Sequence, residues 1–583
     1  MGVFKSSFFA ILVLITSVSV GCSPVPSVNH AAVQKHKFAR SAMIALEKSQ
    51  RQDHAFRQNL SPTAKKADEI VRAIRQDEID HFWRVHSVSG DDTTERSAGQ
   101  MFPLARPYIL ETKLWRVVER MPKGALLHAH LLAMLPYEVL LDTVFHTDSM
   151  TVSSSHNLAT EQSRREASIL FSCSEATPLN SPTIESTDYV PRTPVSIQSV
   201  LMSFPGGEEA FLNFIKSKMT MALNKSVRHE LGVDQVWRRF ENVFSTAASL
   251  LTYEPIVRTF YQRLFERLAD DGISWVEIRT GGPKDPLMRS THGNPAQNRS
   301  RRSDKSEQPS ASPDLWWEIL EDELKKFKAT VKGRNFWGAR VIWTDSRAMN
   351  TSLLIHIRFP DLISGYDLVG QEDLGRPLVD LTSELLWFQE QAHSLNVSML
   401  FFFHAGETLG DGNSTDENLF DALLLGTRRI GHGFSLYKHP TLLRSVMENR
   451  VMVEVCPISN EVLRLATDIL HHPLPAMIAH GVPTAVSNDD PAILGQDAAG
   501  LSYDFYQVIQ GFDNIGLAGL GALAHNSLRW SHFEDQTRAD WILDIDLAEN
   551  GSGTKARYIQ EWNRQWEDFC SWIVDEFGEQ YGR

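Results

Sequence analysis

The chain has 583 residues, of which 42% are hydrophobic and 22% are charged. This balance excludes a largely disordered protein and supplies enough apolar residues for one large core with appendages. The formal net charge of −14 at pH 7 argues against general binding to the phosphate backbone of nucleic acids, and it suits a soluble secreted protein.

The N-terminus has the layout of a cleavable secretory signal. A lone lysine precedes an apolar stretch over residues 8–20, and small residues stand at Ser19 and Gly21. The stretch is too short to favour a permanent membrane span, and no later segment is apolar over the length that crosses a bilayer. We therefore expect a signal peptide over residues 1–21 and an extracellular protein. A lipoprotein signal at Cys22 is the alternative, although Ser19 stands where that signal has a branched apolar residue.

Two further patterns fit a secreted protein. Asn-x-Ser/Thr sequences, the acceptors of N-linked glycans, predict a glycoprotein, although such tripeptides also arise by chance. They begin at Asn59, Asn224, Asn298, Asn350, Asn396, Asn413 and Asn550. The four cysteines are far apart, so the sequence shows neither a disulfide framework nor the spacing of a zinc ribbon.

Residues 22–110 are predicted to form a helical segment before the main domain, which is expected over residues 111–575. Amphipathic helices are expected within residues 30–85, with a break at Ser61 and Pro62.

Two segments of the main domain have little helical or strand periodicity. Residues 143–235, taken as approximate bounds, are an irregular insertion that begins rich in Ser, Thr, Pro and Asn. Residues 281–314 are low in apolar residues and Arg-rich at the centre. This composition predicts a mobile loop, solvated or cleavable, rather than a binding site.

The remainder alternates between short apolar runs and helical patterns. The eight runs cover residues 124–131, 273–280, 338–345, 362–370, 398–407, 428–433, 451–460 and 483–490. Helical patterns such as DLWWEILEDELKKFKATV separate most of them. This order predicts an α/β fold, a (β/α)8 barrel of the TIM type.

Polar residues follow these runs, at the strand ends where such a barrel gathers its active site. The ends of the first, fifth, sixth and eighth runs carry His128 and His130, His404 and Glu407, His432, and Asp489 and Asp490. Residues i and i+2 of a strand point to the same side, so His128 and His130 can face one metal ion. Alone, this pair is equally compatible with two ordinary histidines. Three histidines and an aspartate match the ligands of zinc, with one position left for water.

Five motifs in this order resemble the adenosine deaminase family: MPKGALLHAHL, FFFHAGE, RRIGHGFSL, EVCPISNEVL and SNDDPAILG. VWRRFENVF, GYDLVGQEDLG and LSYDFY resemble its secreted branch, the adenosine deaminase-related growth factors. The resemblance spans residues 100–575 and implies a barrel of the metal-dependent hydrolase type. The N-terminal helices fit the dimerising segment of that branch, which implies a homodimer. The branch's insertion often contains a disulfide, but Cys173 is the only cysteine within it here.

The resemblance implies roles for the residues at the strand ends. The ligands of one Zn²⁺ per chain would be His128, His130, His404 and Asp489. His432 and Asp489 would orient the attacking hydroxide against C6 of a purine nucleoside. Glu407, in its protonated form, would donate to ring N1. No second cysteine follows Cys456 at the spacing of cytidine-type zinc deaminases, and GYDLVGQED has no lysine to bridge a second metal ion.

The resemblance also implies contacts to the substrate. The backbone N–H of Gly370 would meet ring N3, and Asp490 would meet N7. Trp237 and Glu241 stand where the secreted branch has pocket residues, although a tryptophan packed into the core would give the same pattern. The histidines outside the motifs are taken as ordinary ones: His439, His471, His472 and His480.

The sequence departs from the family pattern at the sugar. Family members have an aspartate one or two positions after the second histidine, where it binds a ribose hydroxyl, and here those positions are Leu131 and Leu132. Ser346 stands where secreted relatives tend to have a histidine. Two hypotheses follow: a secreted zinc deaminase that converts adenosine, 2′-deoxyadenosine or a related nucleoside to inosine and ammonia, or a secreted nucleoside-binding or growth-factor-like protein with little turnover. The retained Glu407, His432 and Asp490 favour the enzyme.

Overall fold

The computed structural model describes residues 30–85, 95–173, 181–221, 226–282, 314–347, 358–395, 397, 399–497 and 500–582. Several predicted features lie outside them: the signal peptide at residues 1–21, Cys22, most of the loop at 281–314, and Asn224, Asn298, Asn350 and Asn396. The chain separates into two compact units, Met1–Ser49 and Gln50–Arg583. The first unit contains most of α1 (His30–Gln50), a helix with no residue that is buried in the described structure.

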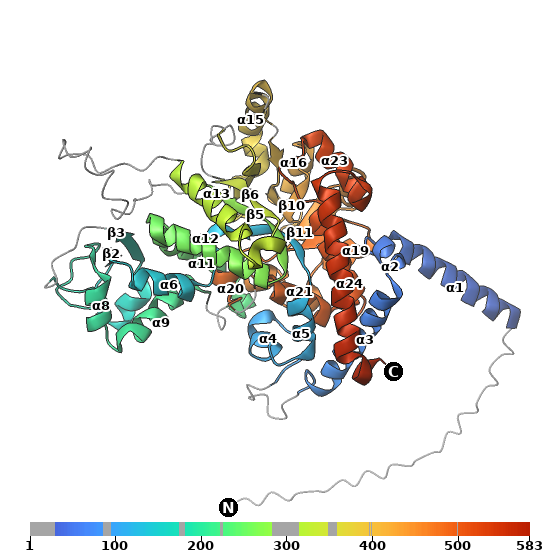
Figure 1. The fold of residues 1–583 in the computed structure, drawn as a ribbon, viewed down its shortest axis with the longest axis horizontal. Coiled ribbons are helices and arrows are strands. Elements are labelled where there is room, and N and C mark those ends of the chain that lie inside the picture. The colour runs from blue at the N-terminus through green and yellow to red at the C-terminus, as the bar shows by residue number, and fades with distance from the viewer. Residues whose placement is uncertain are drawn as a thin grey trace, which may run out of the picture. The chain divides into compact units, whose positions relative to one another are not determined.

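The second unit is built around short parallel strands (Figure 1). They form two sheets, ordered β1-β5-β6-β7-β8 and β12-β11-β10-β9. Their bounds are β1 (Gly124–His130), β5 (Ile273–Thr280), β6 (Gly338–Ser346), β7 (Ile363–Val369), β8 (Leu400–Phe401), β9 (His404–Ala405), β10 (Arg429–His432), β11 (Met452–Val455) and β12 (Thr484–Val486). Each of the eight predicted apolar runs coincides with a strand.

Two links join these sheets into a ring, one through the chain and one through hydrogen bonds. β8 and β9 are parts of one run, separated only by Phe402 and Phe403. At the other edge, the amide of His130 donates to the carbonyl oxygen of Asp489 at 3.0 Å, and the amide of Asp489 donates to that of His128 at 3.1 Å. With β8 and β9 counted as one strand, the described strands form an eight-membered parallel ring, and this parallel α/β arrangement confirms the predicted fold class.

Helices lie between many of the successive strands, and a further group, α20 to α24, follows the last strand β12. Their bounds are α12 (Glu254–Asp270), α13 (Leu315–Lys328), α15 (Thr382–Ser394), α16 (Asn418–Leu424), α17 (Pro440–Glu448), α18 (Pro457–Val462), α19 (Leu474–Ala479), α20 (Pro491–Leu494), α21 (Leu501–Gly511), α22 (Gly516–Arg529), α23 (Arg538–Leu547) and α24 (Thr554–Tyr581). α22 contacts both β1 and β12, so it covers the seam where the ring closes. There the amide of Ala125 donates to the Ser527 hydroxyl at 2.9 Å.

The helices before the first barrel strand pack on the barrel unit. They are α2 (His54–Gln58), α3 (Pro62–His81), α4 (Phe102–Ile109) and α5 (Lys113–Arg120). The predicted break is confirmed, because the Ser61 side chain caps α3 by accepting from the amide of Ala64 and Pro62 is the first residue of the helix. α3 packs against α24 near the C-terminus. The domain boundary expected at residue 110 stays a prediction.

The segment expected to be irregular contains more regular structure than its composition suggests. An antiparallel sheet, ordered β3-β2-β4, consists of β2 (Met150–Ser154), β3 (Ile169–Cys173) and β4 (Val195–Ser196). The helices around it in the chain are α6 (Tyr137–Phe145), α7 (Glu161–Glu166), α8 (Ile197–Ser203), α9 (Gly207–Met219) and α11 (Val233–Leu250) (Figure 1). Cys173 is a free cysteine. No helix in the described part of the chain is both long and apolar enough to span a membrane.

Candidate active site

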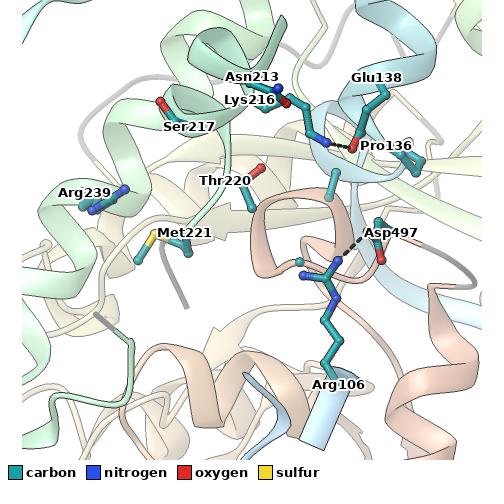
Figure 2. Close-up of a pocket in the computed structure, with 12 residues that line it drawn as sticks. Arg106, Pro136, Glu138, Asn213, Lys216, Ser217, Thr220, Met221, Arg239 and Asp497 are labelled. Carbon is teal, nitrogen blue, oxygen red and sulfur yellow. Dashed lines mark hydrogen bonds and ion pairs between the residues drawn. The ribbon is translucent and has the colours of Figure 1, made fainter. Parts of the chain in front are cut away.

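A pocket with a volume of about 400 Å³ opens between the insertion and α20 (Figure 2). Lys216 of α9 and Arg106 line it, and each forms an ion pair with an acidic side chain, Glu138 and Asp497 respectively. None of the predicted site residues is among its described lining residues. This pocket is therefore beside the predicted centre and not part of it.

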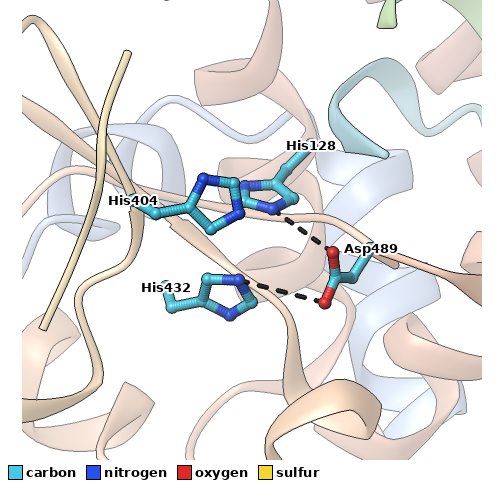
Figure 3. Close-up of side chains that lie close together, drawn as sticks. All are labelled: His128, His404, His432 and Asp489. Carbon is cyan, nitrogen blue, oxygen red and sulfur yellow. Dashed lines mark ion pairs between the residues drawn. The ribbon is translucent and has the colours of Figure 1, made fainter. Parts of the chain in front are cut away.

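The predicted centre lies at the C-terminal ends of the barrel strands (Figure 3). His128 of β1, His404 of β9, His432 at the end of β10 and Asp489 after β12 are all buried, and their nearest ligand atoms lie within 4.8 Å of one another. Asp489 lies between two imidazoles: its Oδ1 is 3.4 Å from Nε2 of His128, and its Oδ2 is 3.9 Å from Nε2 of His432. Barrel closure thus brings together residues far apart in the sequence.

His130 joins the same cluster through Asp489. Its Nε2 atom is 3.3 Å from Asp489 Oδ1, and its ring centroid is 5.5 Å from that of His128 and 5.4 Å from that of His404. His130, Asp489 and Asp490 form a second group with metal-binding geometry. Proximity alone therefore does not decide whether His130 or His432 completes a set of metal ligands.

Two buried carboxylates distinguish the histidines of the cluster. Glu454 Oε2 is 2.9 Å from His128 Nδ1, and Asp367 Oδ2 is 2.7 Å from His404 Nδ1. A metal-binding imidazole commonly donates its other N–H to a carboxylate in this way, which leaves the Nε2 lone pair for the ion. At His432, Nδ1 lies 3.4 Å from the Asn460 amide nitrogen and 3.5 Å from Oε1 of Glu407, so this ring lacks the close carboxylate contact, below 3 Å, that His128 and His404 have.

The sequence analysis did not identify Asp367 or Glu454 as residues of the site. Each is an acidic residue inside an otherwise apolar strand, in GYDLVG and VMVEVC, and this was the available signal. Although burial opposes ionisation, the pKa of Glu454 falls to about 2 because Arg279 and Arg429 lie beside it. Both carboxylates are therefore anionic at neutral pH, since Arg279 and His404 also hold the pKa of Asp367 far below its ordinary value.

Buried arginines balance these charges inside the barrel. Arg279 contacts Asp367 at 2.8 Å and Glu454 at 2.7 Å, and the side chains of all three are fully buried. Arg429 lies 2.6 Å from Glu454 and 2.9 Å from Glu277. Because each carboxylate faces a guanidinium, the carboxylates that orient His128 and His404 are themselves held in place.

Asp489 is fixed by both its side chain and its backbone. The Ser459 hydroxyl donates to Asp489 Oδ2 at 2.7 Å. Although burial opposes it, the imidazoles of His128 and His130 beside Asp489 hold its pKa well below the ordinary value. Asp489 and His432 have φ angles of 57° and 61°, in the left-handed region that non-glycine residues seldom adopt. Such conformations gather at functional sites.

Glycine is required at one position beside the cluster. A Cβ atom at Gly431 would lie 2.8 Å from Cε1 of His128. Any other residue would displace this imidazole, so the glycine lets the His128 ring lie directly against the neighbouring strand.

The side chains of Glu407 and Asp490 are buried carboxyl groups, and each has one oxygen without a hydrogen-bond partner in the described structure. Oε1 of Glu407 and Oδ1 of Asp490 have no hydrogen-bond partner among the described residues. Burial, followed by the nearby charges of Asp489 and Glu372, raises the pKa of Glu407 well above its ordinary value. Burial and Asp489 likewise raise the pKa of Asp490. Their surroundings therefore favour the protonated form of both groups, in which a carboxyl group can donate a hydrogen bond.

The position of Glu407 depends on a second buried glutamate that the sequence analysis did not single out. Oε1 of Glu372 accepts from the amide of Glu407 at 3.0 Å, and its Oε2 accepts from that of Gly406 at 3.3 Å. The side-chain amide of Asn418 also donates to Oε2, at 2.8 Å. These bonds fix the turn after His404 and so the direction in which Glu407 leaves the backbone.

The predicted substrate residues have different surroundings. Gly370 has a φ of 108°, and a Cβ atom there would meet no described atom within 4 Å, so open space adjoins this backbone. Trp237 is buried against Phe240, with ring centroids 5.1 Å apart, whereas Glu241 is exposed on α11. The assignment of Trp237 and Glu241 to the substrate pocket stays a prediction.

The two leucines at the predicted sugar position differ in burial. Both belong to a short 3-10 helix, η1 (Leu131–Ala133), directly after β1. Leu131 is 1% exposed, and Leu132 is half-buried. Position 132 is therefore the one where a polar side chain can be placed without entering the core.

Comparisons with known proteins show which family the chain belongs to. The adenosine deaminase family matches residues 217–547. The chain belongs to the adenosine deaminase family and is accordingly an aminohydrolase, an enzyme of hydrolytic deamination.

Individual relatives extend the match over most of the chain. An adenosine deaminase of Lutzomyia longipalpis is 31% identical over 473 residues, which cover 79% of this chain and 80% of that protein. Adenosine deaminase 2-A of Danio rerio is 31% identical over 523 residues, 86% of this chain and 91% of that one. Relatives named adenosine deaminase 2 confirm the resemblance to the secreted branch. Among solved structures, an adenine deaminase from Arthrobacter aurescens is 18% identical with a TM-score of 0.45, covering 76% of this chain and 99% of that one.

Proposed function

We propose that this protein is a secreted, zinc-dependent deaminase that converts adenosine, 2′-deoxyadenosine or a related 6-aminopurine nucleoside to the corresponding inosine and ammonia. One observation carries the proposal. His128 Nε2, Glu407 Oε1 and Asp490 Oδ1 are buried at one centre without hydrogen-bond partners in the described structure. Such unpaired atoms also occur elsewhere in the described chain, but three of them beside a buried cluster of histidines and an aspartate support a bound metal ion and a polar heterocycle.

The side chains of the centre fit a zinc ion. The proposed ligands are His128, His130, His404 and Asp489. They offer neutral imidazole nitrogens and an anionic oxygen, and the carboxylates behind His128 and His404 leave Nε2 of each ring available. When bound, zinc would lower the pKa of a water molecule, which makes this water a usable nucleophile at neutral pH.

Three residues act on the reacting atoms in this proposal. Glu407, whose burial favours the protonated form, donates its proton to ring N1, which makes C6 electrophilic. His432 and Asp489 orient the attacking water against C6. His432 also stabilises the negative charge that develops on the oxygen, and ammonia then leaves.

Other groups hold the purine. The backbone N–H of Gly370 donates to ring N3 across the open space beside it. Asp490, whose burial favours the protonated form, donates to N7. Trp237 and Glu241 of α11 are proposed to line the nucleoside side of the pocket. A purine meets all of these donors at once, and this combination supports a 6-aminopurine as the substrate.

Secretion and assembly are part of the proposal. The N-terminal sequence supports a cleaved signal at residues 1–21, and Asn59, Asn413 and Asn550 are acceptor sites within the described chain. The helical segment at 22–110 is proposed to form a homodimer. In α1, the side chains of Phe38, Met43 and Leu46 are exposed in the single chain, which supports a role in assembly.

Substrate preference tests the proposal at Leu132. Wild-type protein is expected to deaminate adenosine, followed by the ultraviolet change from adenosine to inosine, but with a raised KM and little discrimination among adenosine, its deoxy forms and 5′-modified analogues. Leu132→Asp restores a charged acceptor for a ribose hydroxyl, worth about 1.5–3 kcal/mol. Its KM for adenosine is therefore expected to fall by up to roughly ten- to a hundredfold.

Two variants serve as comparisons for Leu132→Asp. Leu424→Asp adds the same charge at an exposed position of α16 and is expected to leave KM unchanged. Leu131→Asp places the carboxylate in the core, so thermal unfolding should show a loss of stability that Leu132→Asp does not share. The interpretation of Leu132 is wrong if wild type already binds adenosine tightly and distinguishes its sugars. The enzymatic proposal fails if wild type with zinc bound deaminates no 6-aminopurine nucleoside.

A further inference from the structure

A buried chain of hydrogen bonds leads away from His432, and it passes through a histidine taken as ordinary in the sequence. Asn460 lies in α18, directly after β11. His472 follows η7 (Ile469–His471). His432, Asn460 and His472 are 1%, 0% and 4% exposed, and Asn460 lies between the two imidazoles.

The direction of this chain is set at its far end by a backbone amide, which can only donate. The N–H of Leu474 donates to Nδ1 of His472 at 3.1 Å. Burial lowers the pKa of His472 to about 3, so its ring is neutral and carries one proton. That proton must be on Nε2, which lies 2.9 Å from Oδ1 of Asn460 and donates to it.

The same reasoning continues to His432. Because Oδ1 of Asn460 accepts from His472, the Asn460 amide nitrogen is the atom that faces Nδ1 of His432, at 3.4 Å. An amide nitrogen only donates, so Nδ1 of His432 accepts. Oε1 of Glu407 also lies 3.5 Å from this Nδ1, and a Glu407 carboxyl group that carries its proton is compatible with an acceptor there. A ring nitrogen that accepts a hydrogen bond carries no hydrogen, so the ring proton of His432 is on Nε2. This atom lies 3.9 Å from Asp489.

The surroundings keep these groups in place. The backbone carbonyl of Asn460 accepts from the amides of Leu465 and Ala466, at 2.8 and 2.9 Å. The ring of His472 meets that of Phe434 edge to face, with centroids 5.6 Å apart. Phe434, Leu465 and Ala466 form a small apolar cluster separate from the main core. The chain of donors is thus set before any substrate binds.

We propose that Asn460 and His472 are positioning residues that hold His432 in the tautomer with its N–H on Nε2, directed at the reaction centre. The chemical meaning of this tautomer rests on the function proposed above. An N–H donor stabilises negative charge on the attacking oxygen, whereas a lone pair at the same position repels it. We call these hydrogen bonds from Leu474 through His472 and Asn460 to His432 the relay. If the relay is broken, Asn460 no longer selects which ring nitrogen of His432 carries the proton.

Asn460→Asp tests the proposal with almost no change in shape. The new carboxylate still accepts from His472, but toward His432 it can only accept, so it selects the tautomer with the proton on Nδ1. Nitrogen-15 NMR of the full-length protein labelled at histidine reports the tautomer, and the signal of His432 is identified by its loss in His432→Gln. We expect protonated Nε2 in wild type and protonated Nδ1 in Asn460→Asp. The kcat is expected to fall about a hundredfold or more, because the wrong tautomer removes the donor. KM and zinc content should not change.

Variants of the adjacent histidines separate positioning from a structural effect. His472→Phe removes the donor to Asn460 and is expected to lower kcat about tenfold, the cost of losing one oriented hydrogen bond. His472→Gln keeps an N–H donor and should recover much of this loss. His471→Phe is the matched control, because His471 is exposed and bonds only with Thr467 and Asp468 in the described structure. It should behave as wild type.

The tautomer of His432 seen by NMR can be determined whether or not the protein deaminates a nucleoside. Wild-type His432 with its proton on Nδ1 overturns the proposal, as does a tautomer that is the same in wild type and Asn460→Asp. Equal loss of kcat in His472→Phe and His472→Gln also contradicts it. If no nucleoside is deaminated but the tautomer reverses in Asn460→Asp, the relay is supported and the proposed function fails.

Discussion

Replacing Glu407 with glutamine is expected to lower kcat by about a thousandfold or more, within the range that a general acid contributes. Glutamine has nearly the same shape and keeps an N–H donor, but it cannot transfer a proton to ring N1. Elemental analysis should show unchanged zinc, because Glu407 is not a proposed ligand. Calorimetry with a non-hydrolysable purine nucleoside should show affinity within a few-fold of wild type.

The control for this variant is Glu417→Gln, which makes the same change at an exposed residue just before α16. It is expected to keep the wild-type kcat. Nearly unchanged turnover in Glu407→Gln would refute the role of Glu407 as the proton donor. Loss of zinc together with turnover would mean that the residue supports the centre in another way.

Replacing Arg279 with methionine is expected to lower the free energy of unfolding by about 3–5 kcal/mol, the cost of breaking a buried ion pair from one side. Arg279 is fully buried and contacts both Asp367 and Glu454. The variant leaves these carboxylates without one of their cations while they still face His404 and His128. Urea unfolding monitored by circular dichroism measures the effect.

Arg263→Met is the matched control, because Arg263 pairs with Glu266 on the exposed surface of α12. Its effect on unfolding is expected to be below about 1 kcal/mol, as for most exposed ion pairs. Similar values for the two variants would show that the buried network contributes no more than a surface pair. Zinc affinity should fall in Arg279→Met alone, because the carboxylates then no longer hold the imidazoles in place.

Much of the centre could be predicted because its signals are local. His128, His404 and Asp489 each follow a short apolar run, and a parallel barrel places all such strand ends on one face. The eight runs therefore predicted both the fold and the meeting point of residues distant in sequence. Even the departure at Leu132 is visible in the sequence, because it lies two positions from a motif histidine.

The supporting residues could not be predicted in the same way. Glu454 reaches His128 across the barrel, and this contact depends on strand register and on ring closure between β1 and the segment after β12. His472 looked ordinary because its role depends on a neighbour in another element, Asn460. The insertion also formed a sheet where composition suggested none, since strand pairing there is between distant segments such as β2 and β4.

A zinc titration tests most directly whether this protein deaminates a 6-aminopurine nucleoside at a single metal site. Metal-free protein, prepared with a chelator, is titrated with Zn²⁺ while the conversion of adenosine to inosine is followed in the ultraviolet. We expect no activity without metal. The rate of deamination should then rise linearly with added zinc and reach a plateau at about one zinc per chain, because the proposed site has a single set of four ligands. Full activity in the metal-free protein, a plateau at two zinc ions per chain, or no deamination at any zinc concentration would contradict this proposal.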